Sequence, residues 1–125
     1  MKTILHSDHA PAALGPYSQA NVLGDLIFTS GQLGIDPETG LLPEALEAQT
    51  RNSICNLRSI LESGGSDLAK VLKTTVFLSD MNDFAAVNAI YAEYFTEPFP
   101  ARSCVQVARL PKDAKIEIEA IAARE

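Results

Sequence analysis

Two stretches with helical spacing of apolar residues flank a run of β-branched residues, and this order restricts the fold most. Residues 44–63 and the stretch from Asp80 to about Phe95 each carry an apolar stripe with a period of three to four residues. Between them, residues 71–79 are rich in β-branched side chains and predict a central strand. A strand placed between two amphipathic helices favours a sheet covered by those helices.

Further strands are predicted toward both ends of the chain, where apolar and polar residues alternate. They cover residues 2–6, 17–23, 26–33, 102–107 and 116–120. Gly24-Asp25 is a two-residue hairpin signal between the second and third of these strands. The order predicts an α+β fold, namely a two-layer sandwich of a mixed β-sheet with two helices on one face. We expect residues 1–125 to form a single domain, because this length can bury one core.

The charge and composition exclude several classes of function. The formal net charge is −6 and the basic residues are scattered, so a nucleic-acid partner is not expected. Polar residues interrupt the N-terminus too soon for a signal peptide, and no apolar run approaches the length of a membrane span. We therefore expect a cytoplasmic protein without a membrane partner. Cys55 and Cys104 are far apart and form no CxxC pair, which predicts neither a metal site nor a disulfide.

Polar residues alternate along the two strands near the C-terminus. Period two places Arg102, Cys104 and Gln106 on one face of their strand, and Glu117 and Glu119 on one face of theirs. If the valines and isoleucines of these strands pack under the helices, both polar sets share the opposite, uncovered face. That face is either a solvated polar surface or a site for a small ligand.

Two further features leave a structural and a functional interpretation open. Small polar residues end an apolar strand at Thr29-Ser30-Gly31-Gln32, where Gly31 either lets a ligand approach the backbone or forms a β-bulge. Asn88 interrupts the apolar stripe of the second predicted helix. A buried amide there needs hydrogen-bond partners, which are either a neighbouring loop or a ligand.

Several motifs, in the right order and over essentially the whole chain, closely resemble the RidA (YjgF) family. They are Gly15-Pro16-Tyr17-Ser18-Gln19-Ala20, Phe28-Thr29-Ser30-Gly31-Gln32, Thr75-Val76-Phe77-Leu78, Asn82-Asp83-Phe84, Pro100-Ala101-Arg102-Ser103-Cys104-Val105, Ala108-Arg109-Leu110-Pro111-Lys112-Asp113 and Ile116-Glu117-Ile118-Glu119-Ala120. The resemblance implies a RidA/chorismate mutase-like sandwich that assembles as a homotrimer, with a site in each cleft between subunits.

The resemblance also implies an activity, which is the hydrolytic deamination of reactive 2-imino acids and their enamines. The substrates would be 2-iminobutanoate and 2-iminopropanoate, the products 2-oxo acids and ammonia, and no cofactor would be needed. By this resemblance, Arg102 binds the substrate carboxylate and Glu117 positions the attacking water. The implied substrate-binding residues are Arg102, Tyr17, Ser30, Gly31, Asn88 and Cys104. These types suit the reaction, because an arginine fork matches a carboxylate and a glutamate can deprotonate a water.

Other functions fit parts of the same pattern. A regulator that binds a 2-oxo acid or amino acid without turnover would use Arg102 equally well, but it would not need a base at Glu117. A ribonuclease or translation inhibitor, a label that some family members carry, fits poorly with an acidic chain. A redox-activated holdase has no distinctive feature here. Cys104 has no histidine close in sequence to activate it, so we expect its backbone N–H and its side chain to line the pocket.

Overall fold

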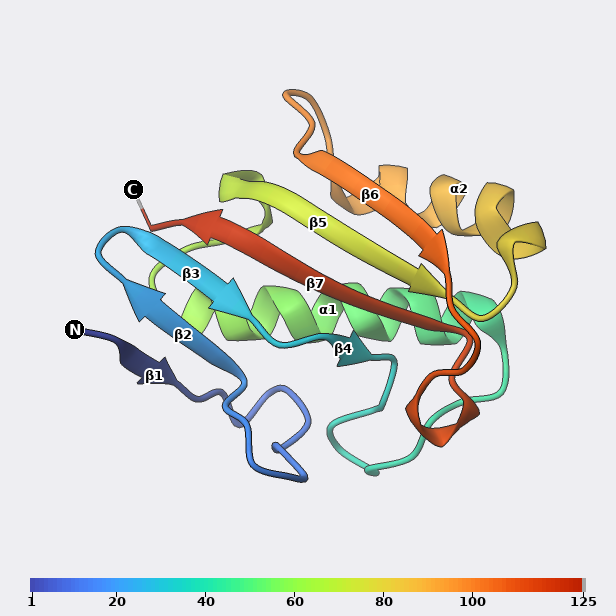
Figure 1. Ribbon diagram of the computed structural model, residues 1–125, viewed down its shortest axis with the longest axis horizontal. Helices are drawn as coiled ribbons and strands as arrows, with labels where there is room; N and C mark the ends of the chain where they lie inside the picture. Colours follow the sequence, from blue (N-terminus) through green and yellow to red (C-terminus); the bar gives the residue numbers. More distant parts are fainter. Residues whose placement is uncertain (125) are drawn as a thin grey trace.

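The computed structural model describes residues 1–124, which form one mixed β-sheet with both α-helices on the same face (Figure 1). The strands are β1 (Thr3–Leu5), β2 (Ala20–Leu23), β3 (Leu26–Thr29), β4 (Gln32–Leu33), β5 (Val71–Leu78), β6 (Ala101–Gln106) and β7 (Ile116–Ala123). The helices are α1 (Leu46–Ser63) and α2 (Phe84–Tyr94), with short 3-10 turns at Leu68–Lys70, Met81–Asp83 and Pro111–Asp113. The predicted two-layer α+β sandwich is confirmed.

The last strand of the chain lies in the middle of the sheet (Figure 1). The strand order is β1-β2-β3-β7-β5-β6, and β4 pairs with β7 beyond the end of β3. All neighbours are antiparallel except β5 and β6, which are parallel and are connected through α2. Every second residue of β7 from Ile116 to Ala122 is buried, as a central strand under helices requires. The position of β7 places Glu117 in the middle of the sheet, whereas Arg102 lies on the edge strand β6.

The helices bury most of the stripes that their spacing predicted, although Phe84 at the start of α2 is 37% exposed. In α1 the buried apolar residues are Ile54, Leu57, Ile60 and Leu61, and in α2 they are Val87, Ile90 and Tyr91. The helix α1 begins at Leu46, two residues later than its predicted start at residue 44. It ends at Ser63 with Gly64 as its C-cap, and the following Gly65 has a φ of 82°, which glycine adopts without strain. Neither helix in the described part of the chain is long and apolar enough to cross a bilayer.

Polar side chains of α1 hold the chain segment that follows β3. Ser53 Oγ donates to the carbonyl of Gln32 at 2.7 Å, and Asn56 Nδ2 donates to the carbonyls of Leu33 and Ile35 at 3.1 and 2.9 Å. Both α1 side chains are buried, so these hydrogen bonds satisfy groups that water does not reach. The helix therefore fixes the segment 32–35, which lines the larger pocket described below.

Candidate functional site

Arg102 lies on the helix-covered side of the sheet, so its predicted position on the uncovered face is wrong. In the parallel pair of β5 and β6, Arg102 is opposite Thr74 and Cys104 is opposite Val76. Thr74 and Val76 are fully buried beneath the helices, and residues opposite each other share a face. The valine on which the prediction depended, Val105, instead leaves 43% of its surface exposed on the other face. Alternation shows which residues share a face but not which face is buried.

Glu117 and Glu119 do lie on the uncovered face, as predicted. Their neighbours Ile116 and Ile118 are fully buried on the helix side, and side chains alternate along β7. Glu117 is opposite Phe77 of β5, three residues after Thr74, the partner of Arg102. An odd spacing along one strand reverses the face, so Arg102 and Glu117 of one chain point to opposite sides of the sheet. One chain alone therefore does not bring both groups to the same small molecule.

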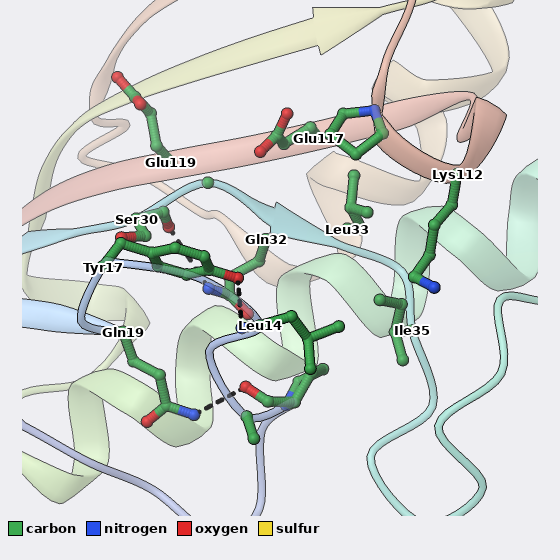
Figure 2. Close-up of a pocket in the computed structure, with 14 residues that line it drawn as sticks. Leu14, Tyr17, Gln19, Ser30, Gln32, Leu33, Ile35, Lys112, Glu117 and Glu119 are labelled. Carbon is green, nitrogen blue, oxygen red and sulfur yellow. Dashed lines mark hydrogen bonds between the residues drawn. The ribbon is translucent and has the colours of Figure 1, made fainter.

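A pocket of about 650 Å³ opens around Glu117, and we call it the Glu117 pocket (Figure 2). Its lining comes from the loop before β2, the junction of β3 and β4, the segment after β4, the turn before β7 and β7 itself. The lining residues are Pro11, Ala12, Leu14, Tyr17, Gln19, Ser30, Gly31, Gln32, Leu33, Ile35, Pro111, Lys112, Glu117 and Glu119. The sequence-predicted residues Tyr17, Ser30, Gly31 and Glu117 thus meet in one pocket.

Gly31 sits directly against the Glu117 side chain. A Cβ atom at position 31 would overlap the Glu117 carboxylate, so any other residue would force that carboxylate to move. The predicted strand 26–33 is also interrupted here, between β3 and β4. Next to it, Ser30 Oγ donates to the carbonyl of Ser18 at 2.6 Å. This hydrogen bond ties the junction of β3 and β4 to the chain entering β2.

Burial raises the pKa of Glu117 above its ordinary value, and the negative charge of Glu119 raises that pKa further. Both causes disfavour the ionised form of Glu117. A carboxylate with a raised pKa is a stronger base toward a bound water than an ordinary surface glutamate. The local environment therefore suits Glu117 to proton transfer.

A second pocket, of about 440 Å³, surrounds Arg102 on the other side of the sheet. Its lining residues are Asn88, Tyr91, Ala92, Phe95, Phe99, Pro100 and Arg102. The Nη1 atom of Arg102 donates to Asn88 Oδ1 at 2.6 Å. The guanidinium carbon lies 4.9 Å from the ring centroid of Tyr91 and 5.5 Å from that of Phe84, within the range of cation–π attraction.

Asn88, for which the sequence left a loop contact or a ligand contact open, binds Arg102 through its amide oxygen. The hydroxyls of Tyr91 and Thr74 share a 2.8 Å hydrogen bond, which fixes the ring beneath the guanidinium. Within residues 1–124, no carboxylate lies at ion-pair distance from Arg102. The guanidinium is thus oriented by neutral groups and keeps its charge available for an anion.

Cys104 packs against the core beside Val76, and its half-buried thiol does not line either pocket. Burial raises the pKa of the Cys104 thiol, while the positive charge of Arg102 opposes part of this effect. The thiol therefore stays protonated at neutral pH, unlike the low-pKa thiolates that act as nucleophiles.

No group of three metal-ligating side chains gathers anywhere in residues 1–124.

Tyr91 and Gln19 are among the pocket residues that the sequence interpretation did not assign to a site. Tyr91 was assigned to the apolar stripe of a helix, and that spacing carries no sign of its contact with Arg102. Gln19 lies just before β2, in a stretch predicted as strand, and its side chain turns toward the loop that precedes it. Apart from its place in the motif Gly15-Pro16-Tyr17-Ser18-Gln19-Ala20, the signal for Gln19 was a polar residue next to a proline- and glycine-rich loop.

The fold and its two pockets define an α+β domain with a glutamate-lined pocket and an arginine-lined pocket on opposite sides of its sheet. The family described as endoribonuclease L-PSP matches residues 7–124, so the chain belongs to this family, which is the RidA (YjgF) family that its motifs resemble. A relative from Salmonella typhimurium, named 2-iminobutanoate/2-iminopropanoate deaminase, is 54% identical over 99% of both chains.

Two solved structures from Escherichia coli have the same fold. The structure of the YjgF gene product superimposes with a TM-score of 0.94 and is 52% identical, covering 98% of this chain and 99% of its own. The structure of TdcF with bound serine also has a TM-score of 0.94, at 47% identity and with the same coverage. These values show that the arrangement of strands and helices described above is that of the family.

Proposed function

We propose that this chain is an enzyme that hydrolyses reactive 2-imino acids, such as 2-iminobutanoate and 2-iminopropanoate, to 2-oxo acids and ammonia. The identity of 54% over full length to a deaminase of these two compounds supports the proposal. The structural observation that carries it is a half-buried glutamate, Glu117, with a raised pKa, held against Gly31 in a pocket large enough for such acids.

The reaction needs a positioned water and a proton acceptor more than it needs a covalent nucleophile, because imines already hydrolyse in water. Water oxygen bonds to C2 of the imine while the Glu117 carboxylate takes a proton from that water. Glu117 returns this proton to the nitrogen, which gives a carbinolamine with a hydroxyl and an amino group on C2. Glu117 then passes the hydroxyl proton to the amino group, so the C–N bond breaks and ammonia leaves as the C2 carbonyl forms. Arg102 holds the substrate carboxylate with its planar fork of N–H donors, each hydrogen bond contributing roughly 1.5–3 kcal/mol.

We infer that two copies of the chain build each site, because Arg102 and Glu117 of one copy point to opposite sides of the sheet. The uncovered face supports this arrangement, since apolar side chains there remain about half exposed within the described chain. Leu23 is 56% exposed, Phe28 is 40% exposed and Val105 is 43% exposed. Packing of this face against other copies would bury these side chains and enclose the Glu117 pocket. The resemblance to RidA favours a homotrimer with one site in each cleft.

The remaining site residues receive roles that follow from their positions. Tyr17 and Ser30 form walls of the Glu117 pocket, and Gly31 gives space to the carboxylate. Asn88 orients Arg102, and Cys104 supports the strand from beneath. We place this small-molecule reaction in the cytoplasm, with residues 1–125 as one domain. Nucleic acid is not a partner of a chain with this acidic balance.

Ammonia release distinguishes the deaminase from a binding protein without turnover. A threonine dehydratase can generate 2-iminobutanoate in the cuvette, and ammonia or 2-oxobutanoate formation is followed with and without this protein. We expect the protein to accelerate release in proportion to its concentration. Binding of 2-oxobutanoate without any acceleration would instead support the regulator, an interpretation with which the serine bound to TdcF agrees.

The acidic limb of the pH–rate profile reports the protonation of Glu117. Because its pKa is raised, activity is expected to fall at a pH above the ordinary glutamate value of about 4.3 as the base becomes protonated. Glu119→Gln removes the second cause of that shift, so the acidic limb should move to lower pH while activity at neutral pH is kept. An unchanged or upward-shifted limb would exclude the electrostatic coupling of the two carboxylates.

A further inference from the structure

We propose that Gln19 is a positioning residue that fixes the apolar wall of the Glu117 pocket and thereby sets the affinity for the substrate side chain. This inference rests on the proposed deaminase function. The wall is the segment Pro11–Tyr17, which contributes Pro11, Ala12, Leu14 and Tyr17 to the pocket. The segment contains no helix or strand, so its position depends on side-chain contacts.

Gln19 is only 3% exposed, and backbone groups of Pro11 and of the chain just before the wall satisfy its whole side-chain amide. Its Oε1 accepts from the N–H of Ser7 at 2.7 Å. Its Nε2 donates to the carbonyl of Pro11 at 2.8 Å and to that of Ser7 at 3.2 Å, with a longer contact to Ala10 at 3.5 Å. Figure 2 shows the Gln19 amide pointing at this loop.

The Gln19 backbone connects the wall to the junction of β3 and β4. Its carbonyl accepts from the N–H of Ser30 at 2.9 Å, directly before the glycine that contacts Glu117. At the far end of the wall, the Tyr17 hydroxyl accepts from the N–H of Leu14 at 3.3 Å, as Figure 2 shows. One residue thus joins the apolar wall to the junction of β3 and β4, against which the proposed base packs.

This arrangement separates the binding of the substrate side chain from the chemical step. Gln19 contacts neither Glu117 nor Arg102 through a hydrogen bond, so its loss leaves the proposed base and the carboxylate fork in place. Its loss leaves the Ser7 N–H and the Pro11 carbonyl without hydrogen-bond partners. The wall then moves so that water can reach these two groups. A displaced wall weakens contact with the substrate side chain but not with its reacting carbon, so KM should change more than kcat.

The test is Gln19→Met, which keeps the length of the side chain and removes all of the side chain's hydrogen bonds. The substrates are imines that an amino acid oxidase produces in situ from alanine and from leucine. We expect KM to rise about five- to tenfold for the leucine-derived imine and less for the alanine-derived one, with kcat within about twofold. If Gln19→Met does not fold, Gln19→Glu keeps the acceptor for Ser7 but loses the donor to the carbonyls of Ser7 and Pro11, so it should still raise KM for the leucine-derived imine. The control is Ile60→Val, which loosens the core of α1 away from the pocket and should change neither KM.

Amide hydrogen exchange gives a readout that does not need turnover. Gln19→Met should accelerate exchange in residues 7–17, and Ile60→Val should not. The role of Gln19 would be overturned by any of three results. These are unchanged exchange in residues 7–17, equal KM values for wild type and Gln19→Met, and a fall in kcat alone. A wild-type protein without deaminase activity would overturn the proposed function instead, while the exchange experiment would still decide whether Gln19 holds the wall.

Discussion

Glu117→Gln is expected to lower the turnover of 2-iminobutanoate by about 10²–10⁴-fold, which is the range that a general base contributes. Glutamine keeps the size of the side chain and its fit against Gly31, but it cannot accept a proton from water. Binding of a 2-oxo acid should survive, because Arg102 is untouched. Steady-state kinetics and calorimetry with 2-oxobutanoate separate the two effects.

The same substitution should not weaken the fold, which excludes unfolding as the cause of lost activity. Because the pKa of Glu117 is raised in the folded state, the folded protein holds this proton more tightly than the unfolded chain does. Stability therefore decreases as the pH rises through the Glu117 pKa, and the ionised glutamate is a cost at neutral pH. Glu117→Gln should keep or raise the thermal midpoint at pH 7. If Glu119→Gln abolished turnover and Glu117→Gln did not, Glu119 and not Glu117 would be the base.

Arg102→Lys is expected to lower kcat/KM by about a hundredfold, even though the positive charge is kept. Lysine loses the planar fork, and one charge-assisted hydrogen bond of roughly 1.5–3 kcal/mol corresponds to about tenfold to more than hundredfold in affinity. The lysine would also not reproduce the contacts with Asn88 and Tyr91 that hold the guanidinium in place. Kinetics with 2-iminobutanoate and calorimetry with 2-oxobutanoate measure the loss.

Arg58→Lys is the matched control for this experiment. The Arg58 guanidinium also lies over an aromatic ring, that of Tyr94 at 5.9 Å, but it lines neither pocket. Its replacement should leave kcat/KM within about twofold of wild type, as is usual for a residue outside the site. Near-normal kinetics in Arg102→Lys, or an equal loss in Arg58→Lys, would remove Arg102 from its proposed role.

Local periodicity was enough to predict the helices, the main strands and the layered architecture. It also placed Glu117 on the correct face, because Ile116 and Ile118 on either side of it are buried as expected. It failed for Arg102, since an edge strand need not bury its valines. Which face is covered depends on the pairing of β6 with β5 and on the helix between them, and this is long-range information.

The pockets were harder to predict than the fold, because they form through contacts between segments that are distant in sequence. The insertion of β7 between β3 and β5 brings Glu117 against Gly31, a pair separated widely in sequence. The hydrogen bonds of Gln19 run backward to residues 7–11, away from the strand that it precedes. Family motifs identified most of these residues, but neither motifs nor periodicity indicated that one chain holds Arg102 and Glu117 on opposite sides of its sheet.

The central claim is that one site takes Arg102 from one copy and Glu117 from another, and mixing two inactive variants tests it most directly. Arg102→Lys and Glu117→Gln proteins are unfolded together in equal amounts, refolded, and assayed with 2-iminobutanoate. If each site spans two copies, about one quarter of the sites receive both intact residues, so activity should return to about a quarter of the wild-type value. Activity that stays at the level of the two separate variants would contradict a shared site.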